Sequence, residues 1–183
     1  MRIDYTDFTK QYISEAVLQL MEEKDFHEIS ITEIAKKAGV GRATFYRNFN
    51  SKEDVLIYHF NNVVEELNSQ TRFIPRCDDD YYDTILSILR TMEKNKNMVQ
   101  LIIKSHLETL LLNYLNEQYL SVFEDAGKPN NTLLPYFYSG AIYNITIQWV
   151  KDDCTEPIEK VAETLFLASF GEKNYKELIE RMK

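Results

Sequence analysis

Apolar side chains recur at helical spacing along almost the whole sequence, and few residues interrupt them. Only five glycines and four prolines occur among the 183 residues. Both residue types break helices, so their scarcity favours long helices. No stretch shows the alternation of apolar and polar side chains that is typical of strands. The sequence therefore predicts an all-α fold of about nine or ten helices.

The first third of the chain predicts three helices and the start of a long fourth. A first helix has its apolar face over residues 8–21. Ser30 and Glu33 form a capping-box pattern that opens a second helix, which Gly39 is placed to end. Further elements are expected as follows: a short helix from Arg42 to Asn48, a long helix capped by Ser51, a break at Pro75, a loop at 125–131, and helices at about 79–95, 98–126 (broken once), 132–152, 156–170 and 173–182.

Charge is distributed unevenly along the chain. The whole sequence has a net charge of -8, yet residues 34–52 contain five Lys or Arg and no Asp or Glu. Salt screens charges that lie more than about 10 Å apart, so the local excess of cations matters more to a bound anion than the total does. This segment is the candidate for contact with nucleic acid.

The sequence gives no sign of a membrane or secreted protein. No apolar run approaches the roughly 18 residues that a membrane span needs, and the N-terminus lacks the apolar core of a signal peptide. The two cysteines, Cys77 and Cys154, are expected to be free thiols in a reducing compartment. A cytoplasmic protein is therefore expected.

Catalytic and metal-binding patterns are missing. The three histidines, His27, His59 and His106, are far apart and fit no metal-binding motif. No glycine-rich phosphate loop or nucleophile motif occurs. The run at 78–80, Asp-Asp-Asp, suits a helix start, and a metal site there is the less favoured alternative. No enzyme activity, cofactor or metal is expected.

The cationic segment has the layout of a helix-turn-helix. Two short helices joined by residues 38–41, Ala-Gly-Val-Gly, match the length and turn residue of that motif. Its second helix enters the DNA major groove and places its N-terminal side chains at base edges. The alternative is a solvated basic face on an ordinary helical protein. The cations on or beside the two helices are Lys36, Lys37, Arg42, Arg47 and Lys52.

Residues 29–56, ISITEIAKKAGVGRATFYRNFNSKEDVL, resemble the DNA-binding signature of the TetR family of bacterial transcription regulators. One departure is Gly41, where the family more often has Ser; glycine is also an acceptable N-cap. The matching positions are Ile34, Ala35, Ala38, Gly39, Val40, Thr44, Tyr46, Phe49, Lys52, Val55 and Leu56.

The resemblance implies a role for each matching position. Thr32 and Arg42 are implied to read bases, and arginine is the commonest specific partner of guanine. Tyr46, Lys52 and Thr44 are implied to contact the phosphate backbone. Ala43 could touch a thymine methyl group, and Arg47 and Asn48 could touch base or phosphate. The implied layout is a three-helix DNA-binding domain at 1–50 and a helical regulatory and dimerisation domain at 51–183.

Two helical segments of the second half are apolar on nearly all sides, at 133–150 and 158–170. Such helices must be covered all round, which predicts a homodimer built on a four-helix bundle. A central helix in a monomeric core is the alternative. This part of the chain also resembles C-terminal regions of dihydroxyacetone kinase operon regulators. The expected interface residues are Tyr136, Gly140, Ile142, Tyr143, Ile147, Trp149, Val161 and Leu165.

The TetR resemblance also implies a ligand pocket among the fourth to seventh helices. For each candidate taken alone, plain core is the favoured alternative. The function expected is a homodimeric repressor that binds double-stranded palindromic operator DNA and leaves it when a small-molecule effector binds. The alternative is a coactivator or interaction module that acts through a protein partner. The candidate pocket residues are Phe60, Val64, Tyr82, Leu86, Leu89, Ile103, Leu107, Leu111, Tyr114 and Tyr119.

Overall fold

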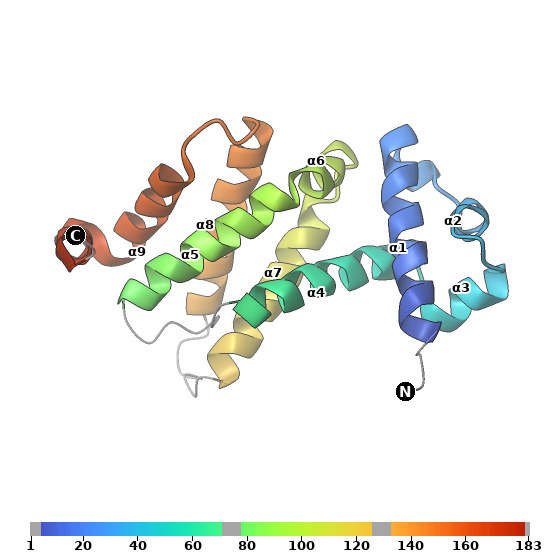
Figure 1. Cartoon of the computed structure of the whole chain (residues 1–183), viewed down its shortest axis with the longest axis horizontal. Coiled ribbons are helices and arrows are strands. Elements are labelled where there is room, and N and C mark those ends of the chain that lie inside the picture. The colour runs from blue at the N-terminus through green and yellow to red at the C-terminus, as the bar shows by residue number, and fades with distance from the viewer. Residues whose placement is uncertain (1–4, 71–77, 126–132, 182–183) are drawn as a thin grey trace. The chain divides into compact units, whose positions relative to one another are not determined.

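The structure, a computed structural model, describes residues 5–70, 78–125 and 133–181, and these contain helices and no strand. The all-α prediction is confirmed. Figure 1 shows the elements, which are α1 (Tyr5–Glu23), the 3₁₀ helix η1 (Phe26–Glu28), α2 (Ile31–Lys37), α3 (Arg42–Asn48), α4 (Lys52–Gln70), α5 (Asp78–Lys94), α6 (Lys96–Lys104), α7 (Glu108–Asp125), α8 (Leu134–Lys151) and α9 (Ile158–Arg181).

Two predicted interruptions are present. The helix expected at 98–126 is broken between α6 and α7. The last two expected helices form α9, which is interrupted at Gly171, where φ is 81° and ψ is 167°. The break expected at Pro75 and the loop expected at 125–131 lie, apart from Asp125, outside the described residues. So do Cys77 and the side chains of residues 78–80.

The chain divides into two compact units. The N-terminal unit runs to Glu65 and includes Lys104–His106, and the C-terminal unit contains Glu66–Ile103 and the chain from Leu107 onward. The division falls within α4, so the first part of this helix belongs with α1 to α3.

The N-terminal unit is built around α1, which packs against α2 and α3. Ile13, Val17 and Met21 lie four residues apart on α1 and are fully buried. Ile34 of α2 and Phe45 of α3 are buried against them in the same unit. Burial of each such side chain contributes about 1.5–3 kcal/mol, so α1 fixes where the two short helices lie.

The start of α4 is capped as its sequence predicts. The Ser51 hydroxyl accepts a hydrogen bond from the Asp54 amide at 3.0 Å, and the Asp54 carboxylate accepts one from the Asn50 amide at 3.0 Å. Further along the helix, Ser14 Oγ of α1 lies 3.3 Å from His59 Nδ1, and burial lowers the pKa of His59. The contact between Ser14 and His59 ties α4 to α1.

In the C-terminal unit α5 packs along α9 and α7 packs along α8. Tyr81 is at the centre of an aromatic cluster, with its ring 4.9 Å from that of Phe170 and its hydroxyl 3.1 Å from Ser169 Oγ. Burial raises the pKa of Tyr81 to about 12. Tyr138 of α8 joins the cluster, its ring 5.8 Å from that of Tyr81.

Several expected interface residues lie in the core of the C-terminal unit. These side chains are at most 7% exposed, so they have little surface left for a partner. The apolar pattern correctly predicted that these side chains are buried. Its periodicity does not indicate whether they are buried by their own chain or by a second subunit. Tyr136 is exposed, and Gly140 and Tyr143 are partly exposed. The five core residues are Ile142, Ile147, Trp149, Val161 and Leu165.

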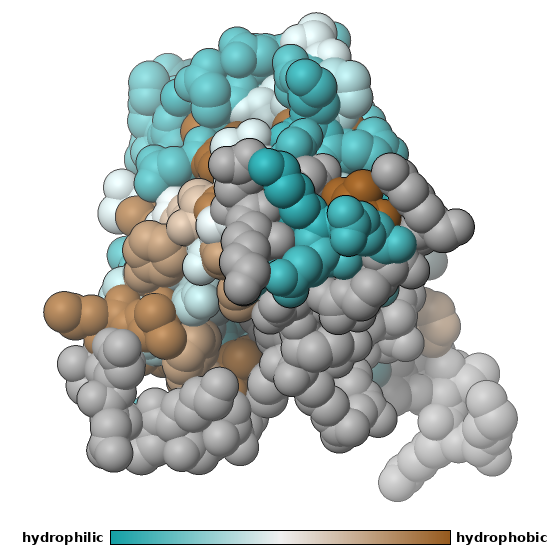
Figure 2. Space-filling view, turned by 90° about the vertical axis from the view of Figure 1, so that its left-hand side faces the viewer, coloured by the Kyte–Doolittle hydropathy of each residue, from teal (hydrophilic) through white to brown (hydrophobic). Residues whose placement is uncertain are grey.

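The open face of α8 combines small and polar residues with the exposed aromatic rings of Tyr136 and Phe137. Phe137, Asn144 and Gln148 are exposed, and Gly140, between them on the same face, is partly exposed. A Cβ atom added to Gly140 would meet no other atom within 4 Å. Figure 2 shows the side of the molecule that faces left in Figure 1, with hydrophilic surface mainly at the top and hydrophobic surface towards the left edge.

Candidate nucleic-acid interface

The capping box predicted for α2 is confirmed. The Ser30 hydroxyl accepts a hydrogen bond from the Glu33 amide at 3.3 Å, and Glu33 Oε2 accepts one from the Ser30 amide at 2.9 Å. Glu33 Oε1 also lies 2.5 Å from the Lys24 ammonium. The hydrogen bond from Lys24, with those from Ser30, lowers the pKa of Glu33 to about 2. The start of α2 is therefore held by Lys24, the residue that follows α1, as well as by its own cap.

The turn between α2 and α3 depends on Gly39. Its φ is +69°, and the amide of the next residue, Val40, donates to the Ala35 carbonyl at 2.9 Å. This pattern ends α2 and turns the chain into α3. Gly41 then caps α3 through its extended backbone, with φ -79° and ψ 154°, and without a side-chain hydrogen bond.

The two glycines of this turn should respond to substitution in opposite ways. No atom lies within 4 Å of a Cβ atom added at either position. The effect of each substitution on stability therefore depends only on backbone conformation and helix capping. Gly39→Ala should lower stability by about 1–2 kcal/mol, because its φ is left-handed. Gly41→Ser should raise stability by a few tenths of a kcal/mol by adding a cap bond. Urea unfolding of both variants measures this. Equal effects would mean that the turn does not have this geometry.

Aromatic packing fixes the inner face of α3. The Phe45 ring is fully buried and lies 6.0 Å from the ring of Phe49, which in turn lies 5.6 Å from that of Tyr58 on α4. With this face held inside, the residues on the opposite side of α3 must face solvent.

That outer face carries four of the predicted DNA contacts. Arg42, Ala43, Tyr46 and Arg47 are all exposed, and Tyr46 keeps 49% of its surface. Exposure of a tyrosine this large, beside two arginines, suits contact with a phosphate backbone and base edges. Arg42 is the first residue of α3, the end that reaches bases in helix-turn-helix proteins.

The other predicted contacts are less open. Thr32 is exposed near the start of α2. Thr44 and Asn48 are partly buried, and both have local partners: Arg47 donates to Thr44 Oγ1 at 3.1 Å, and Asn48 Nδ2 donates to the Thr44 carbonyl at 2.8 Å. Their roles at DNA stay predictions.

Two of the cations have protein partners that the sequence pattern did not reveal. Lys37 Nζ lies 2.6 Å from Glu23 Oε1 at the end of α1. Lys52 Nζ donates to the backbone carbonyls of Phe26, His27 and Ile29. The acidic partner Glu23 lies before the cationic segment, so a charge count over that segment gives no indication that Lys37 is paired.

The candidate pocket residues are divided between the two units. Phe60 and Val64 belong to the N-terminal unit, and the other eight belong to the C-terminal unit. Most are buried, whereas Val64, Ile103 and Tyr119 are partly exposed. The phenol group of Tyr119 is nevertheless enclosed, and burial raises its pKa. These positions are consistent with core packing, and an effector pocket here stays a prediction.

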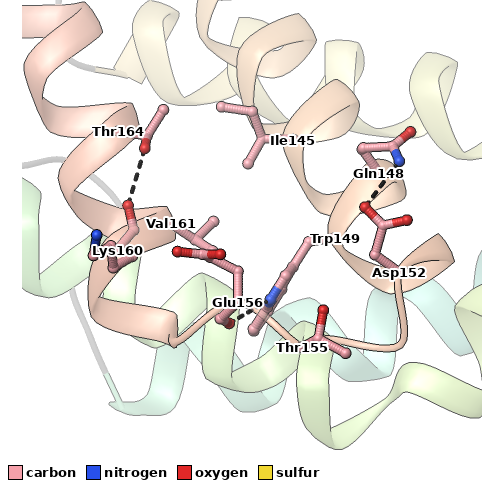
Figure 3. A pocket seen from close by; sticks show the side chains of 9 residues that line it. All are labelled: Ile145, Gln148, Trp149, Asp152, Thr155, Glu156, Lys160, Val161 and Thr164. Atoms are coloured by element: carbon pink, nitrogen blue, oxygen red, sulfur yellow. Dashed lines mark hydrogen bonds between the residues drawn. The ribbon is translucent and has the colours of Figure 1, made fainter.

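A pocket of about 330 Å³ lies at the junction of α8 and α9. Figure 3 shows Ile145 and Trp149 on one side and Lys160 and Thr164 of α9 on the other. Trp149 Nε1 donates to the Glu156 carbonyl at 2.9 Å, which joins the end of α8 to the start of α9. The sequence did not predict a pocket at this place.

Two short helices, a left-handed glycine turn and an exposed Arg42–Arg47 face define a helix-turn-helix DNA-binding protein. Residues 13–58 match the family model described as bacterial regulatory proteins of the tetR family, and residues 79–170 match one described as a transcriptional regulator C-terminal region. The chain belongs to the TetR family. Members of this family are transcription regulators and not enzymes, as the sequence predicts. None of the described helices is long and apolar enough to span a membrane.

Relatives and solved structures agree with this assignment. The dhaKLM operon transcriptional activator DhaS of Lactococcus lactis is 31% identical over 95 residues, which are 50% of this chain and 47% of that protein. This chain thus aligns with less than half of that relative. Lin0861 from Listeria innocua has a similar fold, with a TM-score of 0.77 at 19% identity over 92% of this chain and 93% of that one.

A third similarity is to FadR of Bacillus subtilis, whose structure was solved in complex with stearoyl-CoA. The TM-score is 0.54 at 19% identity, covering 88% of this chain and 98% of that one. Identities this low show a shared fold.

Proposed function

We propose that the protein is a homodimeric repressor that holds a palindromic operator and leaves it when a small molecule binds its C-terminal domain. The observation that carries the proposal is the exposed face of α3, with Arg42, Ala43, Tyr46 and Arg47 opposite a buried aromatic anchor. In a dimer, two such helices would occupy successive major grooves roughly 34–36 Å apart. A cytoplasmic location follows from this role.

The proposed division of labour follows the domains expected from the sequence. Residues 1–50 would contact DNA, and residues 51–183 would bind the effector and the second subunit. Because the N-terminal unit extends to Glu65, the first part of α4 moves with the DNA-binding helices. A shift of α4 would therefore change the position of α3, and an effector that prefers one position would change the affinity for DNA.

The open face of α8 supports the proposed dimer. Small and polar residues on this face would let a second α8 approach closely, and the exposed Lys160, Thr164 and Ala168 of α9 continue the surface. A stable interface of this kind buries upwards of about 1,000 Å². The proposed interface therefore uses Gly140, Asn144 and Gln148 in place of the core residues expected from the sequence.

The effector is proposed to be an apolar or amphiphilic small molecule. The C-terminal unit holds a cluster of aromatic rings around Tyr81, Tyr138 and Phe166, with the Ser169 hydroxyl among them. Rings with a few hydroxyl groups suit a largely apolar ligand. The stearoyl-CoA complex of FadR, which shares the fold, supports an amphiphilic ligand.

The test begins with a duplex that the wild-type protein selects from a random-sequence DNA library. On this duplex, Arg42→Ala should weaken binding by about 1–3 kcal/mol and mainly through one base pair. Tyr46→Phe, the matched control, removes one hydroxyl at an expected phosphate contact, so it should weaken all sequences alike. Affinities for the selected duplex and its single-base variants measure both effects.

Two outcomes would count against the proposal. An equal effect of Arg42→Ala on every base variant would show that this side chain does not read a base. If the protein selected no duplex, the alternative of a coactivator that acts through a protein partner would replace it. The similarity to DhaS, a transcriptional activator, leaves the direction of regulation to be decided by expression from the selected promoter.

A further inference from the structure

The ammonium group of Lys52 lies among backbone carbonyls. Lys52 Nζ donates to the carbonyl oxygens of Phe26 at 2.6 Å, His27 at 3.1 Å and Ile29 at 3.1 Å. It also lies 4.5 Å from the centre of the Phe26 ring, over a residue that is fully buried. A lysine ammonium has three N–H donors, so these three carbonyls account for all of them.

The carbonyls converge because of the turn that precedes α2. Phe26–Glu28 form the 3₁₀ helix η1, whose Phe26 carbonyl also accepts from the Ile29 amide at 3.1 Å. The carbonyls of His27 and Ile29, at and just beyond its end, have no continuing turn of η1 to accept from. They carry the partial negative charge of a helix C-terminus, which favours a cation. Lys52 supplies that cation from the first residue of α4, more than twenty residues further along the chain.

The segment that Lys52 binds, residues 26–29, leads directly into α2 and α3, the two helices of the helix-turn-helix. Ser30 follows Ile29 and caps α2, where Glu33 completes the cap and pairs with Lys24. At the other end of α2, Lys37 pairs with Glu23. The two ends of α2 are thus tied to Lys24 and Glu23, at and just after the end of α1, and Lys52 of α4 binds the segment that precedes α2.

We propose that Lys52 is a positioning residue for DNA binding: it fixes the start of α2, and with it Thr32 and α3, against the first turn of α4. This assignment replaces the phosphate contact that the family resemblance implied, since a phosphate would have to compete with three carbonyls that are already bound. The DNA part of the inference rests on the proposed function. The chemical part concerns the free protein alone, so the two can fail separately.

The chemical part is tested on the wild-type protein by reductive methylation with formaldehyde and a borane reductant, followed residue by residue by mass spectrometry. Lys36, exposed on α2, is the internal standard. Lys52 should react about tenfold or more slowly than Lys36, because its hydrogen bonds must break first, and bound DNA should not change its rate. A Lys52 that reacts as fast as Lys36 and is protected by DNA would overturn the inference.

The DNA part compares Lys52→Met with Lys36→Met on the selected duplex at several KCl concentrations. A lost phosphate contact would reduce the slope of log affinity against log salt by about 0.9. Loss of positioning should instead weaken binding about tenfold with the slope unchanged, while hydrogen exchange at the amides of residues 29–33 becomes faster. Lys36→Met should leave that exchange unchanged.

Lys52→Arg is the rescue variant. Its guanidinium keeps a cation with several donors, so affinity and exchange should both move back towards the wild-type values. A reduced slope with unchanged exchange in Lys52→Met, or no effect on either, would overturn the positioning role. If Lys52→Met does not fold, the methylation rates of the wild-type protein still decide between the two roles.

Discussion

Gly140→Arg is expected to convert the proposed dimer into a monomer. Space around Gly140 is open within one subunit, so the folded monomer can accept the larger side chain. In the dimer the guanidinium would be buried without a partner, at a cost of about 3–5 kcal/mol. The dimer dissociation constant should therefore rise at least about a hundredfold. Sedimentation velocity over a range of protein concentrations measures the change.

The control for this prediction is Asn97→Arg. Asn97 is exposed on α6, a helix outside the proposed interface. Its replacement by arginine therefore adds the same charge as Gly140→Arg at a position where no partner is expected. This variant should remain a dimer, and both variants should keep the wild-type helical circular dichroism. If Gly140→Arg also stayed dimeric, the open face of α8 would not be the interface.

Trp149→Ala is expected to lower the stability of the C-terminal unit and not to weaken the proposed dimer directly. Trp149 is 4% exposed, and its ring N–H satisfies the Glu156 carbonyl at the start of α9. Truncation of a buried tryptophan costs about 3–5 kcal/mol. The melting temperature should fall by about 6–20 °C, given roughly 2–4 °C per kcal/mol for a chain of this size. Calorimetry measures the shift.

Trp149→Phe separates packing from the hydrogen bond. It keeps an aromatic ring in place and removes the N–H donor, so it should cost about 1 kcal/mol. Both variants should still sediment as dimers below their melting temperatures. A Trp149→Ala variant with wild-type melting and a dissociated dimer would show that the side chain faces the partner, as the apolar pattern first suggested.

The helices α2 and α3 could be predicted because the sequence features that begin and end them are local. The Ser30 and Glu33 pair is three residues apart, and Gly39 acts through its own φ. Both features therefore appear in the sequence much as they do in the structure. The inward and outward faces of α3 followed as well, because Phe45 and Phe49 could only pack on one side.

The interface proposed on α8 could not be predicted in the same way. An apolar helix shows that it must be buried, but the sequence does not state which subunit buries each stripe. Ile142 and Trp149 are covered within the chain. The open face holds Gly140, which the sequence analysis included, together with Asn144 and Gln148, which a search for apolar stripes does not find. Lys52 is a similar case, since the direction of backbone carbonyls depends on a turn 23 or more residues away.

The pairing of cations inside the N-terminal unit has a consequence for how the protein searches the chromosome. Of the five cations at 34–52, Lys37 pairs with Glu23 and Lys52 donates to backbone carbonyls. Lys36, Arg42 and Arg47 are exposed, and Arg47 donates only to the neutral Thr44 hydroxyl in the described part of the chain. With Arg42 assigned to a base, phosphate contacts from Lys36 and Arg47 would give a salt slope of only about 2 per subunit, and the net charge of -8 repels DNA elsewhere. Random DNA therefore holds the protein weakly. It should find its target by repeated diffusion through solution more than by long sliding, and few copies per cell should be sequestered on non-target sequence.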